Sequence, residues 1–160
     1  MVLTSVRYKF SQKFSVPVED AFSWATDYDP EDYTLMGLEG RRKVDKITED
    51  TYVLHDTRKT DSGAVEKTRL VRINPERHSL SNTHIDGPTL HSQFWYDFFP
   101  EKGGGSRLEF TGLLLYPSDR PLSKSEVSRI AAEERRGDSL IWKNLAKAME
   151  ADLKSLRKRR

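Results

Sequence analysis

The chain has 160 residues, a length typical of one domain that buries roughly 70% of its unfolded surface in a single core. Aromatic residues make up 10% of the chain, which excludes a disordered polymer, and the absence of cysteine excludes disulfides, thiolate metal sites and cysteine nucleophiles. The formal net charge is +2, but five cations lie among the last seven residues without an acid, so the rest of the chain is mildly acidic.

Residues 1–14 alternate polar and apolar side chains, which predicts a strand with one solvated face that ends near Val16. They contain no uninterrupted apolar run of the kind that signal peptides carry. The apolar run at 113–116 is far shorter than the roughly 20 residues that cross a bilayer. We therefore expect a cytoplasmic protein.

Two short helices are predicted after this strand. Pro17 stands at the start of the first, followed by the early acids Glu19 and Asp20, a pattern that favours a helix N-terminus. The second is expected from about Asp29 to Met36, before two glycines interrupt it.

From residue 41 to 116 the chain consists of short runs rich in valine, threonine and aromatics, separated by turn residues. This pattern predicts an antiparallel sheet, since no connection is long enough for a parallel crossover. The expected strands are 42–48, 51–59, 64–73, 78–86, 90–99 and 106–116.

The last segment predicts one long amphipathic helix from Ser123 to Lys158. Ser123 and Glu126 have the spacing of a capping box. Gly137 is expected on or beside the inward face, where it would kink the helix or leave space beneath it. The basic end is expected to complement the helix dipole, with anionic lipid as the alternative partner. It comprises Lys154, Arg157, Lys158, Arg159 and Arg160.

Three phrases in this order of elements carry a family resemblance. They are VPVEDAF at 16–22, WYDFFP at 95–100 and GGSRL at 104–108. Together with the order of strands and helices, they resemble the helix-grip fold of the START-like, or SRPBCC, superfamily. The resemblance covers nearly the whole chain and implies a single α+β domain over 1–160, with a curved seven-stranded antiparallel sheet wrapped around the C-terminal helix.

The resemblance also implies an apolar cavity between sheet and helix. Members of the superfamily bind lipids, sterols, polyketides or plant hormones, some are polyketide cyclases or aromatases, and others are chaperone-activating modules. The superfamily has no universal catalytic motif, so the resemblance assigns no catalytic residue here.

The inward face of the sheet follows from matching apolar residues across each hairpin. With Phe110 inside, this register predicts that aromatic rings and hydroxyl groups of the sheet line the cavity. Two residues of the C-terminal helix are expected to cover it. The expected ligand-binding residues are His55, Thr68, Leu70, Thr83, Ser92, Phe94, Tyr96, Phe110, Leu114, Leu145 and Met149.

A slip of one residue would reverse these faces. In that case Arg69, His84, His91 and Trp95 would line the cavity, and Arg69 would anchor an anion. The cations at 41–43 are interpreted as a solvated face in either case.

The leading hypothesis is a noncatalytic binder of a small hydrophobic or lipid-like molecule. The enzymatic alternative is a cyclase or aromatase in which His55 transfers protons and Glu66 orients it. A third class is a protein-interaction module that uses the basic helix end. Deletion of residues 154–160 separates this class from the others, which predict unchanged ligand uptake.

No cofactor is expected, because the glycines at 103–105 lack the residues of a phosphate loop and no dinucleotide pattern follows a strand. A metal site drawn from His84, Asp86 and His91 is less favoured than solvated side chains. The acidic body argues against nucleic acid as a partner. The oligomeric state stays open.

Overall fold

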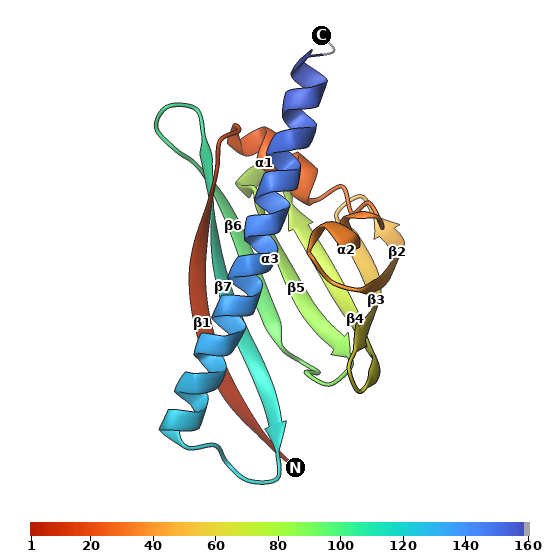
Figure 1. The fold of residues 1–160 in the computed structure, drawn as a ribbon, viewed down its shortest axis with the longest axis vertical. Helices are drawn as coiled ribbons and strands as arrows, with labels where there is room; N and C mark the ends of the chain where they lie inside the picture. Colours follow the sequence, from red (N-terminus) through yellow and green to blue (C-terminus); the bar gives the residue numbers. More distant parts are fainter. Residues whose placement is uncertain (159–160) are drawn as a thin grey trace.

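The computed structural model describes the backbone of residues 1–158 and the side chains of residues 1–156. Its elements follow the expected order, with one long helix lying across a curved sheet (Figure 1). The strands are β1 (Val2–Phe14), β2 (Gly40–Thr48), β3 (Thr51–Thr60), β4 (Gly63–Asn74), β5 (Ser79–Asp86), β6 (Gln93–Pro100) and β7 (Ser106–Ser118). The helices are α1 (Val18–Ala25), α2 (Asp32–Leu35), the 3-10 turn η1 (Pro75–Arg77) and α3 (Lys124–Lys158).

The strands form one seven-stranded antiparallel sheet in the order β1-β7-β6-β5-β4-β3-β2. From β2 to β7, strands that follow one another in the sequence pair with one another, and β1 pairs with β7 at one edge of the sheet. The segment with α1 and α2 connects the two edge strands and lies at the C-terminal end of α3 (Figure 1). The predicted fold class, a sheet curved around a C-terminal helix, is confirmed.

The polar-apolar alternation of β1 positions the sheet on the helix. Val6, Tyr8 and Phe10 are buried, while Arg7 and Lys9 between them are exposed. The strand ends at Phe14, two residues before the expected end. The pleat of the strand therefore sends every second side chain toward α3.

The core consists of two clusters of buried residues. One surrounds α1 and includes Phe22, Phe98 and Met149, and the other surrounds Phe94 and Phe110. The partly buried rings of Tyr96 and Trp142 pack against both clusters. The two rings therefore connect the two halves of the core.

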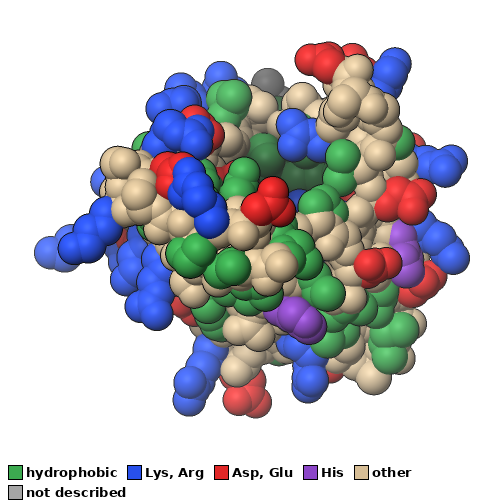
Figure 2. Space-filling view, turned by 90° about the horizontal axis from the view of Figure 1, so that it is seen from below, with side chains coloured by type: hydrophobic (Ala, Val, Ile, Leu, Met, Phe, Trp, Pro, Cys, Tyr) green, Lys and Arg blue, Asp and Glu red, His purple; other side chains and the backbone are tan. Residues whose placement is uncertain are grey.

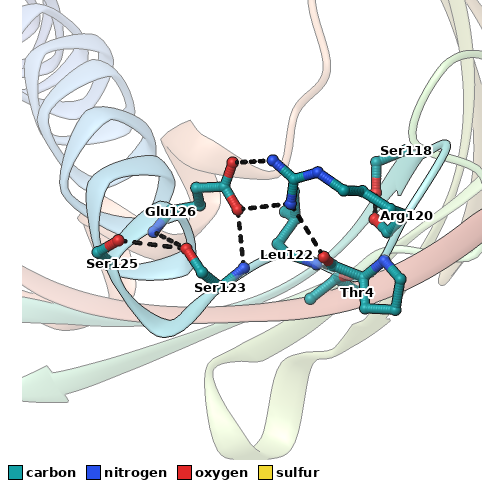
Figure 3. A network of polar contacts seen from close by, with 8 residues as sticks. Thr4, Ser118, Arg120, Leu122, Ser123, Ser125 and Glu126 are labelled. Atoms are coloured by element: carbon teal, nitrogen blue, oxygen red, sulfur yellow. Dashed lines mark hydrogen bonds and ion pairs between the residues drawn. The ribbon is translucent and has the colours of Figure 1, made fainter.

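The N-terminus of α3 carries the predicted capping box (Figure 3). The Glu126 backbone N–H donates to Ser123 Oγ at 3.2 Å, and the Ser123 N–H donates to Glu126 Oε2 at 2.8 Å. Arg120 donates to both carboxylate oxygens of Glu126, at 2.7 and 2.9 Å. The hydrogen bond from Arg120, with those from Ser123, lowers the pKa of Glu126 to about 2. Two N–H groups of the first turn are thus satisfied.

The inward face of α3 differs from the predicted one near its middle. Gly137 is exposed and α3 is one continuous helix, so the expectation of an inward glycine was wrong. Glu134 and Asp138 occupy the inward positions instead, between Ile130 and Ile141. Within residues 1–158, no helix combines the length and the apolar character needed to cross a bilayer.

Candidate functional site

A cavity of about 370 Å³ lies between α3 and the concave face of the sheet. Residues from α1, α2 and the segment between them line one side of it, and Pro88 and Thr89 of the β5–β6 loop line another. Seen end-on in Figure 2, the molecule is hollowed, with hydrophobic side chains inside the hollow and charged side chains near its rim. A space of this size is at the lower end of the range of roughly 300–1,000 Å³ for small-molecule sites.

The apolar wall consists of rings and leucines that sequence reasoning placed inside. Phe94 and Phe110 stack with centroids 5.8 Å apart, and Tyr96 meets Phe110 edge-on at 5.0 Å. Trp142 of α3 lies 5.7 Å from the Tyr96 ring. The predicted residues that line the cavity are Phe94, Tyr96, Phe110, Leu114 and Leu145.

A buried ion-pair network forms the polar wall on β2, β3 and β4. Asp56 accepts from Arg42 Nε at 2.6 Å and from Arg42 Nη2 at 2.9 Å, and it also accepts from Arg69. Burial alone would raise the pKa of Asp56, but the hydrogen bonds and charges of the two guanidinium groups outweigh burial and lower it. The network holds two cations and one carboxylate, so it is net positive.

Two buried polar atoms on this wall have no hydrogen-bond partner among the described residues. They are Nε of Arg69, a donor, and Oδ1 of Asn82, an acceptor. Arg69 pairs with His84 across β4 and β5, and Asn82 lies two residues before His84 on the same face. Unpartnered buried polar groups are costly and uncommon in native structures. Both residues line the cavity from neighbouring strands, so its polar wall contains a donor and an acceptor without partners.

On the helix side, Tyr8 donates to Oδ2 of Asp138 at 2.5 Å. Gly112 makes room for the Tyr8 ring, because a Cβ at position 112 would lie 2.8 Å from two ring carbons. Burial and the Asp138 charge raise the pKa of Tyr8. Burial also raises the pKa of Asp138, although Tyr8 and Lys67 oppose that shift. The pair is a hydrogen-bonded, partly desolvated acid at the edge of the apolar wall.

His84 is the histidine that faces the cavity. Its Nδ1 lies 2.8 Å from Oγ1 of Thr89, and its ring packs 4.9 Å from that of Phe94. Burial, with the positive charges of Lys67 and Arg69, lowers its pKa to about 3. The imidazole is therefore neutral at physiological pH.

The polar residues predicted to bind a ligand lie elsewhere. His55 is exposed on β3, with Nε2 3.0 Å from Asp45 Oδ2, and Glu66 is exposed on β4. Ser92 is fully buried and its Oγ accepts from the Leu115 N–H at 2.8 Å, which is a structural role. None of the following predicted residues lines the cavity: His55, Glu66, Thr68, Leu70, Thr83, Ser92 and Met149.

The β5–β6 connection explains why β3, β4 and β5 turn the face opposite to the predicted one toward the cavity. The prediction started β6 at residue 90 and treated Asp86-Gly87 as a tight turn, but residues 87–92 form a loop with positive φ at Gly87 and His91. Asn82 therefore pairs with Phe94, and even-numbered residues of β5 share the face of Phe94. The later hairpins carry that shift to β4 and β3.

The alternative register is therefore correct for two of its four residues. Arg69 and His84 line the cavity, whereas His91 and Trp95 are exposed. Met149 lies outside the cavity for a different reason, because its side chain is fully buried in the core cluster around α1.

Sequence reasoning missed most of the charged lining. The spacing of Glu134 and Asp138 from Ile130 and Ile141 is helical, so continuing the inward stripe through the acids would have found both. The residues on the strands required the correct register, which the sequence pattern leaves ambiguous. The missed charged lining residues are Asp32, Arg42, Asp56, Arg58, Lys67, Glu134 and Asp138, and the missed polar ones include Thr60, Asn82 and Thr89.

Comparison of the structure with solved structures identifies this architecture. The Zhui aromatase/cyclase from Streptomyces sp. R1128 superposes with a TM-score of 0.76 over 94% of this chain and 96% of its own, at 9% sequence identity. TTHA0849 from Thermus thermophilus has a TM-score of 0.74 over 91% and 98% of the two chains, at 15% identity. The chain has the helix-grip fold.

A third helix-grip structure, Ara h 8.0201, has a TM-score of 0.69 over 92% of this chain and 99% of its own, at 15% identity. No family model and no curated protein matches the sequence. At these identities the comparisons establish the fold, and the chemistry has to be argued from the residues in the cavity.

Proposed function

We propose that this helix-grip protein binds a compact, largely aromatic molecule that carries a polar group at one end. The observation behind this proposal is a cavity of about 370 Å³ with an apolar wall and a polar wall, in which the lining residues Arg69 and Asn82 each have a buried polar atom without a partner. A hydroxyl or carbonyl oxygen accepts from the guanidinium, and a hydroxyl donates to the amide oxygen. The volume favours a compact ring system over a long-chain lipid.

The energetics support a ligand of moderate affinity. Burying about 200–300 Å² of apolar ligand surface contributes about 5–7 kcal/mol before the cost of association. Each neutral hydrogen bond adds about 1 kcal/mol. Binding in the micromolar range follows if the cavity is preformed.

The test is a fluorescence titration with the neutral apolar probe N-phenyl-1-naphthylamine, followed by displacement with 2-naphthol and naphthalene. We expect saturable binding at one site and displacement by both ligands. We expect 2-naphthol to bind several-fold more tightly than naphthalene, because its hydroxyl pairs with Arg69 and Asn82. The variant Asn82→Leu should reduce this difference in affinity. Absence of saturable binding would overturn the proposal.

A second candidate is cyclase-type catalysis in the same cavity. It is favoured by the Tyr8–Asp138 pair, a partly buried acid beside an apolar wall, and by the structural neighbours described as aromatase/cyclases. Ring closure between two carbonyl groups needs a base for a carbon-bound proton and a donor for the developing oxyanion. Among the lining residues, Asp138 is a candidate for the base and Arg69 for the donor. The earlier candidates His55 and Glu66 lie outside the cavity.

Catalysis and simple binding predict different behaviour of Asp138→Asn. If the protein is a cyclase, the variant should lose turnover of an aryl 1,5-diketone while it still binds the naphthylamine probe. No turnover by the wild-type protein, with intact probe binding, would reject this second candidate.

An interaction module that uses the basic helix end is the remaining class. Arg159 and Arg160 lie outside the described residues, as do the side chains of Arg157 and Lys158. Deleting residues 154–160 should leave probe binding unchanged, because no residue beyond Leu145 lines the cavity in the described part of the chain.

A further inference from the structure

Lys67 on β4 is an amine inside the cavity that has no direct polar partner. It lines the cavity, and among the described residues no hydrogen bond and no ion pair within 4 Å holds its ammonium group. Its cross-strand neighbour Asp56 is already bound by Arg42 and Arg69. Lys67 is half-buried, and because no carboxylate pairs with it directly, its amine is available to a molecule in the cavity.

Burial, more than the surrounding charges, shifts Lys67 toward the neutral amine. Arg69 lies on the same strand face, Asp56 is opposite on β3, His84 on β5 is neutral, and Glu134 and Asp138 come from α3. Burial, with the Arg69 charge, lowers the pKa of Lys67 even though the three carboxylates oppose that shift. A neutral amine in an apolar pocket is the form that attacks carbonyl groups.

Glu134 lies on the cavity side of α3 and has no hydrogen bond or ion pair within the described part of the chain. Burial and the Asp138 charge raise its pKa, so a fraction of the carboxyl group stays protonated at higher pH than an exposed glutamate would. A nucleophile and a proton donor therefore line the same cavity.

We propose that Lys67 forms a covalent imine with a small aromatic aldehyde or ketone held in the cavity. The Nζ lone pair bonds to the carbonyl carbon, and one Nζ proton passes to the oxygen to give a carbinolamine. The C–O bond then breaks, the hydroxyl leaves as water with a proton from Glu134, and the remaining Nζ proton returns to Glu134. The balance is one amine and one carbonyl converted to one imine and one water, without an oxidant or reductant.

This proposal rests on the proposed ligand-binding function and narrows the ligand to carbonyl compounds. The test incubates the protein with benzaldehyde and sodium cyanoborohydride at pH 7, which reduces any imine to a stable benzylamine. Peptide mass spectrometry then measures labelling at each lysine. Lys43, whose side chain is 76% exposed, is the internal reference.

We expect labelling at Lys67 to exceed that at Lys43 several-fold, and N-phenyl-1-naphthylamine should suppress it only at Lys67. Lys67→Arg keeps the charge and should abolish the preferred label, while Lys43 is labelled as in the wild-type protein. Lys67→Met provides the same comparison if the arginine does not fit. Glu134→Gln should slow labelling at Lys67 and leave labelling at the exposed Lys43 unchanged.

Labelling that follows exposure, with Lys67 no more reactive than Lys43 in a protein that binds the probe, would overturn the imine proposal and leave the binding function intact. Failure of the probe to bind would instead reject the proposed function. The two failures are therefore distinguishable in one set of samples.

Discussion

Asp56 joins two guanidinium groups in the cavity wall, and all three side chains are largely removed from water. The sequence pattern of Arg41, Arg42 and Lys43 indicated a solvated face, and Arg42 departs from it because its partner lies across the β2–β3 hairpin. Breaking such a pair is expensive, since the remaining charges stay buried.

Asp56→Asn should therefore destabilise the fold by about 3–5 kcal/mol, measured by urea unfolding at pH 7. The matched control is Asp45→Asn on β2, where the exposed ion pairs contribute no more than about 1 kcal/mol. Equal losses in the two variants would contradict a buried, structurally important network.

His84 makes stability depend on pH. Its folded pKa of about 3 lies below the unfolded value of 6.5, so the unfolded chain binds more protons between these values. Stability should fall as the pH drops below about 6.5, by about 2 kcal/mol between pH 7.5 and pH 5.

Comparing wild type with His84→Gln isolates this contribution, because the carboxylates titrate in both proteins. Chemical unfolding at the two pH values should show a smaller loss in the variant. An identical loss would mean that His84 is not held neutral by its surroundings.

Among the elements, α3 has one feature that stabilises the fold and one that destabilises it. Its capping box satisfies two N–H groups, while Gly137 leaves an exposed helical position without a side chain. Ser123→Ala should lower stability by about 1 kcal/mol, and Gly137→Ala should raise it by about 0.5–1 kcal/mol. Thermal unfolding measures both. A destabilising Gly137→Ala would indicate that the glycine has a packing role. The open space where a Cβ at position 137 would lie argues against such a role.

The elements also show how far the sequence specifies this protein. Strand periodicity in β1 and β7 and the helical stripe of α3 are strong patterns, so the architecture and the apolar wall could be predicted. The polar wall could not, because it depended on the conformation of residues 87–92. Side chains on the later strands alternate, so an error in one loop reversed three strands.

For the whole molecule, the two core clusters stabilise the ends of the sheet–helix sandwich while the cavity between α3 and the sheet stays open. An unfilled apolar space costs stability, so its retention is consistent with a ligand site. The buried donor and acceptor at its polar wall are consistent with the same role.

The central claim is that this space accommodates a ligand, and filling it from the helix tests that claim most directly. Ile141 lines the cavity, while its neighbour Leu140 is 59% exposed. The measurement is the N-phenyl-1-naphthylamine titration of Ile141→Trp and Leu140→Trp. We predict that Ile141→Trp abolishes saturable binding in a protein that unfolds as cooperatively as wild type, while Leu140→Trp binds unchanged. Equal binding by the two folded variants would contradict the account.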